Sequence, residues 1–447
     1  MSSVPSAAEL LADIATILSF GIRQPGHPGD RQAENWAARR FTELGLEDVA
    51  LEPVELPMWE SAGATLEVWP VGDPASMRRF SGFAAPYTQG CADLERDIVA
   101  FDTTSAMDQI VVEPLAFTEL PQSAVREWAT SVFDPDGDFD TLVQTLPFGP
   151  RLNLVLDPAV EAGAAGYVGI LTGVPWETCR YYVPYDAKPR PLSGLWLSRA
   201  DGIRLQQALG KGRHRGRLNV DGRQSRVRCH NVVGRLPGRG DEKVIIGSHH
   251  DAPWASAVED ASGMALVFAQ ARYWAGVPES SRPHNLEFLL TAGHMAGGAG
   301  TRAFVNQHAD EMPRVVLEVH LEHAAAEVRG DGERLHLTGQ PEPRWWFTST
   351  EPGLQASVAS ALCSEDLRRS FVLPPTVFGP APPTDGSAFY LAGVPVVHFL
   401  TAPMYLFDPA DTIDKIHVPS LEPVTRAAIR IIESVAGRTA AELRGNA

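Results

Sequence analysis

Hydrophobic positions divide the chain into stretches with different periods. Residues 7–20 and 31–44 carry apolar side chains at the spacing of amphipathic helices. Residues 48–70 are predicted to form two extended segments around Pro57. From residue 228 onward, short apolar runs alternate with helical periods, a pattern that is typical of α/β proteins.

This alternation predicts the fold class. Strands are expected at 231–236, 243–248, 285–291, 314–321 and 394–400. Helices are expected at 261–274, 299–309, 350–363, 385–391 and 420–443. Such an order indicates an α/β fold with a mixed, largely parallel sheet flanked by helices on both faces. Ligand sites in these sheets lie at the carboxyl ends of the strands.

Residues 71–225 interrupt this pattern with frequent proline and glycine and with short apparent strands. The stretch is predicted to be a smaller, β-rich inserted domain. Its last part, 211–226, is basic and polar and is predicted to be a linker back to the main domain. The expected division is 1–70 for the first part of the main domain, 71–225 for the insert and 226–447 for the rest.

Composition narrows the function classes. The chain has 447 residues and is 44% hydrophobic, which suits more than one domain with a real core. Its net charge of -17 argues against nucleic acid or an anionic membrane as partner. A small-molecule or short-peptide substrate is compatible with it. A homo-oligomer is left open.

The sequence also favours a cytoplasmic location. Its four cysteines form no CxxC pair, which fits a reducing compartment. The first twenty residues include Glu9 and Asp13 and no basic segment, so no secretory signal is expected. No apolar run is long enough to span a membrane.

Candidate chemistry begins at the end of the strand predicted over 243–248. His249 and Asp251 follow it directly, and Glu259 with Asp260 precedes the next predicted helix. Imidazole and carboxylate groups gathered at a strand end are typical metal ligands. A polar loop with satisfied histidines is the alternative.

Three further groups lie at other predicted strand ends. His294 stands in a glycine-rich turn after 285–291. Strand alternation would place His320 with Glu322 on one face and His323 on the other, so that one of these two sets faces the site. Asp385 could cap the helix that follows it or belong to the site.

Taken in order, these segments resemble the zinc aminopeptidase family, which includes bacterial leucine aminopeptidases, glutamate carboxypeptidase-like enzymes and animal glutaminyl cyclases. The resemblance covers most of the chain and is carried by residues 231–234, 236–238, 244–251, 260–263, 393–396 and 411–416. The insert resembles a protease-associated domain at 162–166 and 198–202.

The resemblance implies a set of metal ligands. The family's first histidine ligand falls on His249, and its supporting aspartate on Asp251. The bridging acid falls on Glu259 and a later acidic ligand on Glu322. All three implied ligands can still bind a metal, and Asp251 is expected to hold the ring of His249.

The other half of the family's two-metal site is lost. The general base position holds His294, which could act as base or as a fourth ligand. The positions of two further ligands hold Met295 and Phe407. The resemblance therefore implies one divalent metal ion, most naturally zinc, with an open position.

Three functions fit this picture. The first is a metal-dependent hydrolase that cleaves an amide or peptide-like bond in a small substrate. The second is a metal enzyme that does not hydrolyse peptides, such as a cyclase or a lyase. The third is a catalytically inactive binding protein on the same scaffold.

Overall fold

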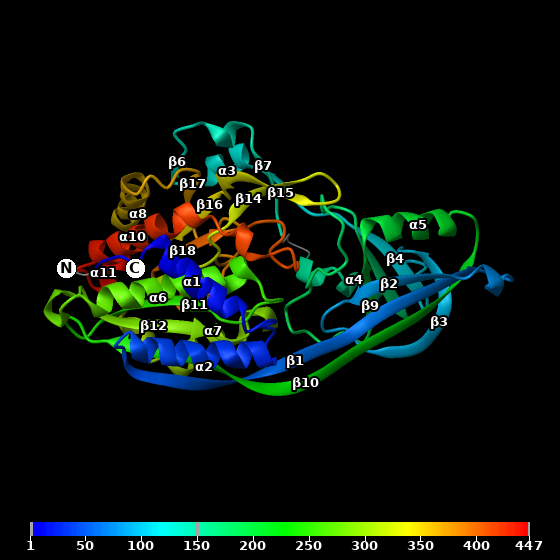
Figure 1. Ribbon diagram of the computed structural model, residues 1–447, viewed down its shortest axis with the longest axis horizontal. Coiled ribbons are helices and arrows are strands. Elements are labelled where there is room, and N and C mark those ends of the chain that lie inside the picture. Colours follow the sequence, from blue (N-terminus) through cyan, green and yellow to red (C-terminus); the bar gives the residue numbers. More distant parts are fainter. Residues whose placement is uncertain (1–2, 148–151, 446–447) are drawn as a thin grey trace.

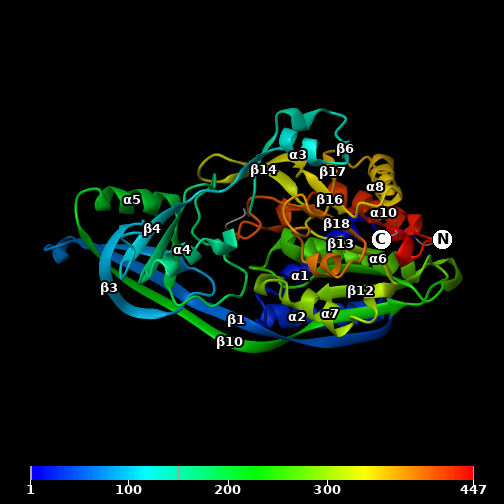
Figure 2. The same cartoon turned by 180° about the vertical axis from the view of Figure 1, so that it is seen from behind.

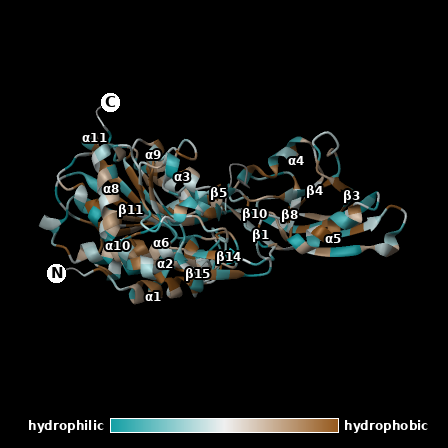
Figure 3. Cartoon of the chain, turned by 90° about the horizontal axis from the view of Figure 1, so that it is seen from above, coloured by the Kyte–Doolittle hydropathy of each residue, from teal (hydrophilic) through white to brown (hydrophobic). Residues whose placement is uncertain are grey.

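The computed structural model describes residues 3–147 and 152–445. Figures 1 and 2 show a main body, which holds both chain ends at one side, and a smaller β-rich part joined to it by two long strands. Figure 3 shows the same two parts from above, with the smaller part at the right.

The centre of the main body is a run of parallel strands. β11 pairs in parallel with β12 and β13, and β13 pairs in parallel with β18. β10 and β16 flank this run in the antiparallel sense. The strands of this part are β12 (Asn285–Thr291), β11 (Lys243–His249), β13 (Val315–Leu321), β18 (Val396–Thr401), β16 (Arg344–Thr348), β17 (Ser370–Leu373) and β6 (Ser131–Phe133).

Helices cover both faces of this sheet. One face packs against α1 (Ala7–Leu18), α2 (Pro28–Glu43), α6 (Gly263–Ala275), α8 (Pro352–Ser364) and α10 (Val418–Ser434). The other packs against α7 (Ala299–Gln307) and α9 (Ser387–Leu391). Strand β11 sends Val244 and Ile246 into the first core and Ile245 into the second, as a two-residue period requires. The predicted α/β fold class is confirmed.

Two strands that the sequence predicts as separate segments are each continuous. β1 (Glu47–Pro70) and β10 (His214–Leu236) pair along most of their length and connect the two parts of the molecule. Pro57 lies within β1 and does not end it. The prediction of a linker at 211–226 is wrong, because residues from His214 onward belong to β10, where Arg215 and Arg217 pair with acidic residues on neighbouring strands.

The smaller part is β-rich, as its sequence suggests. Its elements are β2 (Arg78–Ala84), β3 (Cys91–Ala100), β4 (Ile110–Leu115), α4 (Asp157–Glu161), β8 (Gly166–Leu171), β9 (Ser193–Leu197) and α5 (Arg199–Leu209). The segment with β5 (Glu119–Pro121), α3 (Gln122–Trp128), β6 and β7 (Val143–Thr145) returns to the main body, where β6 pairs with β17. The domain boundaries at 71 and 225 stay a prediction.

Other differences concern the edge of the sheet and the last helix. Strands β16 and β17 and the hairpin of β14 (Ala326–Gly330) and β15 (Leu335–Pro341) have no counterpart in the predicted elements. The helix expected at 420–443 is α10 followed by α11 (Ala440–Leu443). Among the described residues, no helix is long and apolar enough to cross a membrane.

Candidate metal centre

The candidate site lies where the parallel strands end. His249 is the last residue of β11, and Thr291 is the last of β12. Glu322 and His323 directly follow β13. Because parallel strands bring their carboxyl ends to one edge of a sheet, groups from distant parts of the sequence meet here.

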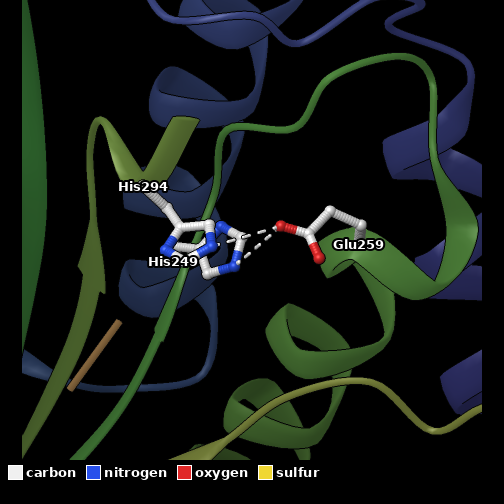
Figure 4. Close-up of side chains that lie close together, drawn as sticks. All are labelled: His249, Glu259 and His294. Atoms are coloured by element: carbon white, nitrogen blue, oxygen red, sulfur yellow. Dashed lines mark ion pairs between the residues drawn. The ribbon is translucent and has the colours of Figure 1, made fainter. Parts of the chain in front are cut away.

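His249, Glu259 and His294 converge in this place (Figure 4). The Nε2 atoms of His249 and of His294 each lie 3.5 Å from Oε1 of Glu259. The two imidazole rings stack with centroids 4.2 Å apart. His249 and Glu259 are fully buried, whereas the side chain of His294 keeps 13% of its exposure.

His323 completes the cluster from the opposite side. Its Nε2 lies 2.7 Å from Oε2 of Glu259, and its Nδ1 lies 2.9 Å from the carbonyl oxygen of Thr401. The residue has a φ of 57°, a left-handed conformation that is uncommon outside glycine. This conformation breaks the strand alternation, which is why alternation alone could not place the side chain.

Several atoms of the cluster that could bind a metal ion have no hydrogen-bond partner. These atoms are Nε2 of His249, Nε2 of His323 and both carboxylate oxygens of Glu259, and all are buried. The close approach of His323 to Glu259 lacks hydrogen-bond geometry. Buried polar atoms are normally paired, and two imidazoles with a carboxylate are a typical zinc donor set. These residues therefore fit a divalent metal ion.

Glu322 borders this cluster without entering it. Its Oε1 accepts a hydrogen bond from the backbone N–H of Asp385 at 2.9 Å and lies 3.0 Å from Nε2 of His320. Its Oε2 lies 4.0 Å from Nε2 of His323. The role of Glu322 as a metal ligand stays a prediction. The Nε2 atom of His323, which has no hydrogen-bond partner, is available as a ligand in its place.

Asp251 acts through two different groups. Its backbone carbonyl, rather than the expected carboxylate, lies 3.0 Å from Nδ1 of His249, whereas Oδ1 is 3.9 Å away. The carboxylate accepts the backbone N–H groups of His294 at 2.9 Å and of Met295 at 2.8 Å. Asp251 therefore fixes both the ring of His249 and the turn that carries His294.

Residues outside the cluster hold the loop between β11 and α6, which carries Glu259. Asp411 accepts the backbone N–H groups of Val258 at 2.8 Å and of Glu259 at 2.9 Å. The buried guanidinium of Arg23 donates to the carbonyl oxygens of His250, Ala255, Ser256 and Glu259. Asp411 thus caps the backbone of this loop, and nothing in the sequence pointed to Arg23.

The other polar residues around the cluster have partners of their own. His250 pairs with Asp30 at 2.8 Å. His320 and His398 both bind Glu318, at 2.9 and 2.5 Å. Asp260 accepts hydrogen bonds from Ser248 and from the N–H of Gly263 at the start of α6.

The three histidines of the cluster differ in pKa because their surroundings carry different charges. Burial and the nearby charge of His294 lower the pKa of His249 to about 3, so that its Nε2 is free at neutral pH. Burial opposes the charged form of His323, but the negative charge of Glu259 raises its pKa to about 9. The hydrogen bond to Asp385 and the charge of Glu259 overcome burial and raise the pKa of His294 to about 10.

Apolar and aromatic groups cover the other side of the cluster. Met295 is buried, and its carbonyl accepts the hydroxyl of Tyr87 at 2.8 Å. The ring of Phe407 lies 4.8 Å from that of Tyr185, which in turn lies 5.6 Å from the ring of His294. Tyr87 and Tyr185 come from the smaller part of the molecule, which therefore contributes to the wall of the site.

A cavity of about 660 Å³ borders the loop between β11 and α6 at Trp254, and its lining residues do not include the side chains of the cluster. Trp59, Phe83 and Trp254 line it, and the guanidinium of Arg180 lies 4.4 Å from the ring of Trp254. Trp254 also donates to the carbonyl oxygen of Phe407 at 2.9 Å, which connects the cavity wall to the covered side of the cluster.

Comparison with known proteins gives the fold a family context. Residues 231–432 match the model of peptidase family M28. No curated protein matches the chain.

Solved structures resemble the whole chain at low sequence identity. An aminopeptidase from Aneurinibacillus sp. strain AM-1 is 18% identical over 98% of this chain and 95% of its own, with a TM-score of 0.64. A peptidase M28 precursor from Shewanella amazonensis is 18% identical over 95% and 92%, with a TM-score of 0.71. A zinc aminopeptidase from Bacillus subtilis is 14% identical over 96% and 95%, with a TM-score of 0.68. The chain thus shares the fold of these solved structures, and its residues 231–432 are similar to peptidase family M28.

Proposed function

We propose that this protein is a metal-dependent hydrolase of the aminopeptidase type, which uses a single zinc ion to cleave an amide or peptide-like bond in a small substrate. The observation that carries the proposal is the set of buried atoms without a hydrogen-bond partner on His249, Glu259 and His323. Zinc held by three protein ligands with one open position polarises a carbonyl group and lowers the pKa of a water molecule. The M28 match and the zinc aminopeptidase neighbour support this choice of metal.

His294 is the proposed general base. Its ring is the most accessible imidazole of the cluster, and its Nε2 faces Glu259. The pKa of about 10 applies to the site without a metal ion; the positive charge of a bound divalent ion beside Glu259 would lower it, so that Nε2 can accept a proton. His294 accepts a proton from a water molecule as the oxygen of that water bonds to the substrate carbonyl carbon. The C–N bond then breaks, and the same proton passes to the leaving nitrogen, so that the products are an acid and an amine.

A second metal ion is not part of the proposal. The two positions that would complete a second site hold Met295 and Phe407, and both are buried among apolar or aromatic groups. A phenyl ring offers no ligand atom, and a thioether suits soft metals such as copper(I). The chain therefore retains one half of a two-metal arrangement.

The cavity beside Trp254 is the proposed substrate pocket. Its volume of about 660 Å³ suits a small ligand or a short peptide. Its aromatic wall favours an apolar substrate group, and Arg180 favours a carboxylate.

Metal content measured by elemental analysis tests the proposal. We expect about one zinc ion per chain in the wild type and a loss of that ion in H249A and H323L. E322Q decides whether Glu322 is also a ligand. His336 is exposed on β15, so H336L is the matched control and should keep the ion.

Activity completes the test. We expect hydrolysis of aminoacyl p-nitroanilides that a chelator abolishes and added zinc restores. One bound ion without any peptide hydrolysis would favour the cyclase or lyase alternative. Absence of bound metal would refute the proposal and favour an inactive binding protein.

A further inference from the structure

Asp385 is a buried carboxylate with an unusual set of partners. It precedes α9, yet its carboxylate does not cap that helix, because Gly386 occupies the N-cap position and has no side chain to contribute. Instead, Oδ2 accepts hydrogen bonds from the hydroxyls of Thr291 and Thr301. Oδ1 lies 3.3 Å from Nδ1 of His294. The capping alternative from the sequence is thereby replaced by a contact within the site.

The two threonines lie on either side of the turn that carries His294. Thr291 ends β12, and Thr301 lies in the first turn of α7. Asp385 therefore connects both ends of this turn and the imidazole within it. The backbone N–H of Asp385 also donates to Glu322 at 2.9 Å, which links the carboxylate to the end of β13.

This arrangement determines which ring nitrogen of His294 faces the metal centre. A carboxylate can only accept a hydrogen bond, so Nδ1 must carry the proton in the contact with Oδ1. Nε2 then faces Oε1 of Glu259 at 3.5 Å. The acceptor that binds one ring nitrogen of a histidine commonly fixes its tautomer in this way.

We propose that Asp385 is a positioning residue that pairs with His294 and keeps its Nε2 available for proton transfer. The catalytic consequence rests on the proposed hydrolase function. During the reaction Nε2 gains the proton from water and returns it to the leaving nitrogen, while the proton on Nδ1 remains hydrogen-bonded to Asp385. The role of the carboxylate is to orient the ring and to stabilise the imidazolium form.

Nitrogen-15 NMR of the imidazoles tests the contact without any substrate. In zinc-loaded protein we expect the His294 signal, assigned by its loss in H294Q, to show a protonated Nδ1 and an unprotonated Nε2. D385N should change this pattern, because its amide can donate to the ring as well as accept. An unchanged His294 signature in D385N would overturn the proposal.

Kinetics provide the second readout. With aminoacyl p-nitroanilides we expect D385N to lower kcat about 100-fold or more with KM changed less than about threefold, since general-base catalysis contributes about 10²–10⁴-fold. D385E should recover part of the loss, and zinc content should stay at the wild-type level. Asp134 is a buried aspartate far along the chain with its own hydrogen bonds, so D134N is the matched control.

The outcomes separate the two proposals. An altered tautomer in D385N together with inactive wild-type protein would refute the hydrolase function and leave the His294–Asp385 contact intact. Full activity in D385N would refute the positioning role and leave the hydrolase function standing.

Discussion

Arg23 should be one of the most sensitive positions in the protein, although it lies outside the metal centre. Its side chain is fully buried and donates four hydrogen bonds to carbonyl oxygens of residues 250–259 at 2.6–3.2 Å. Burial lowers its pKa to about 10, so it stays charged at neutral pH beside Asp411 and Asp260. The substitution R23M keeps an unbranched apolar side chain and removes every donor.

The expected loss of stability is large. Each charged hydrogen bond contributes about 1.5–3 kcal/mol, and removal of the buried guanidinium saves part of its desolvation cost. We therefore expect a net loss of about 4–6 kcal/mol. An unfolding entropy of about 2.1 cal/mol/K per residue converts this loss into a decrease of about 5–10 °C in apparent Tm, depending on how much of the chain unfolds together. Metal affinity should fall as well, because the loop carries Glu259.

Thermal unfolding with and without zinc measures both effects. Arg39 lies exposed on α2, so R39M is the matched control and should shift the apparent Tm by less than about 1 °C. R23K should give an intermediate loss, because one ammonium cannot reach all four carbonyl groups. A decrease of less than about 1 °C in R23M would show that other contacts hold the loop and that the reasoning is wrong.

Three further variants test other parts of the structure. M295E combined with F407H should bind a second metal ion, which elemental analysis would detect, since both positions then offer ligands beside Glu259; a single ion would contradict the half-site. Burial raises the pKa of Glu342 from 4.5 to about 8, so the folded state holds this proton more tightly and stability falls as pH rises between these values. E342Q should therefore raise the apparent Tm above pH 8 by the equivalent of about 1–3 kcal/mol and leave it unchanged near pH 4, and an equal gain at both pH values would oppose this reasoning. G263A should cost about 1–3 kcal/mol in urea unfolding, because its Cβ would collide with the carbonyl of Leu321; wild-type stability would count against this close packing.

The sequence alone determined the fold class, and it predicted where the candidate site lies. Hydrophobic periods fixed the main strands and helices because burial on one or both faces constrains nearly every position in them. The end of each strand then identified His249, Glu259 and His294 as neighbours, since parallel strands share one edge. It missed β16 and β17, which lie between β18 and β6 and are too short for a clear period.

Only the tertiary structure decided which side chains of the site face one another. His323 turns toward Glu259 because of its left-handed backbone conformation, which strand alternation cannot anticipate. Asp385 reaches His294, and Arg23 reaches the loop of Glu259, across long sequence separations. Such contacts depend on how loops from different elements pack together, and no local pattern of residues encodes that packing.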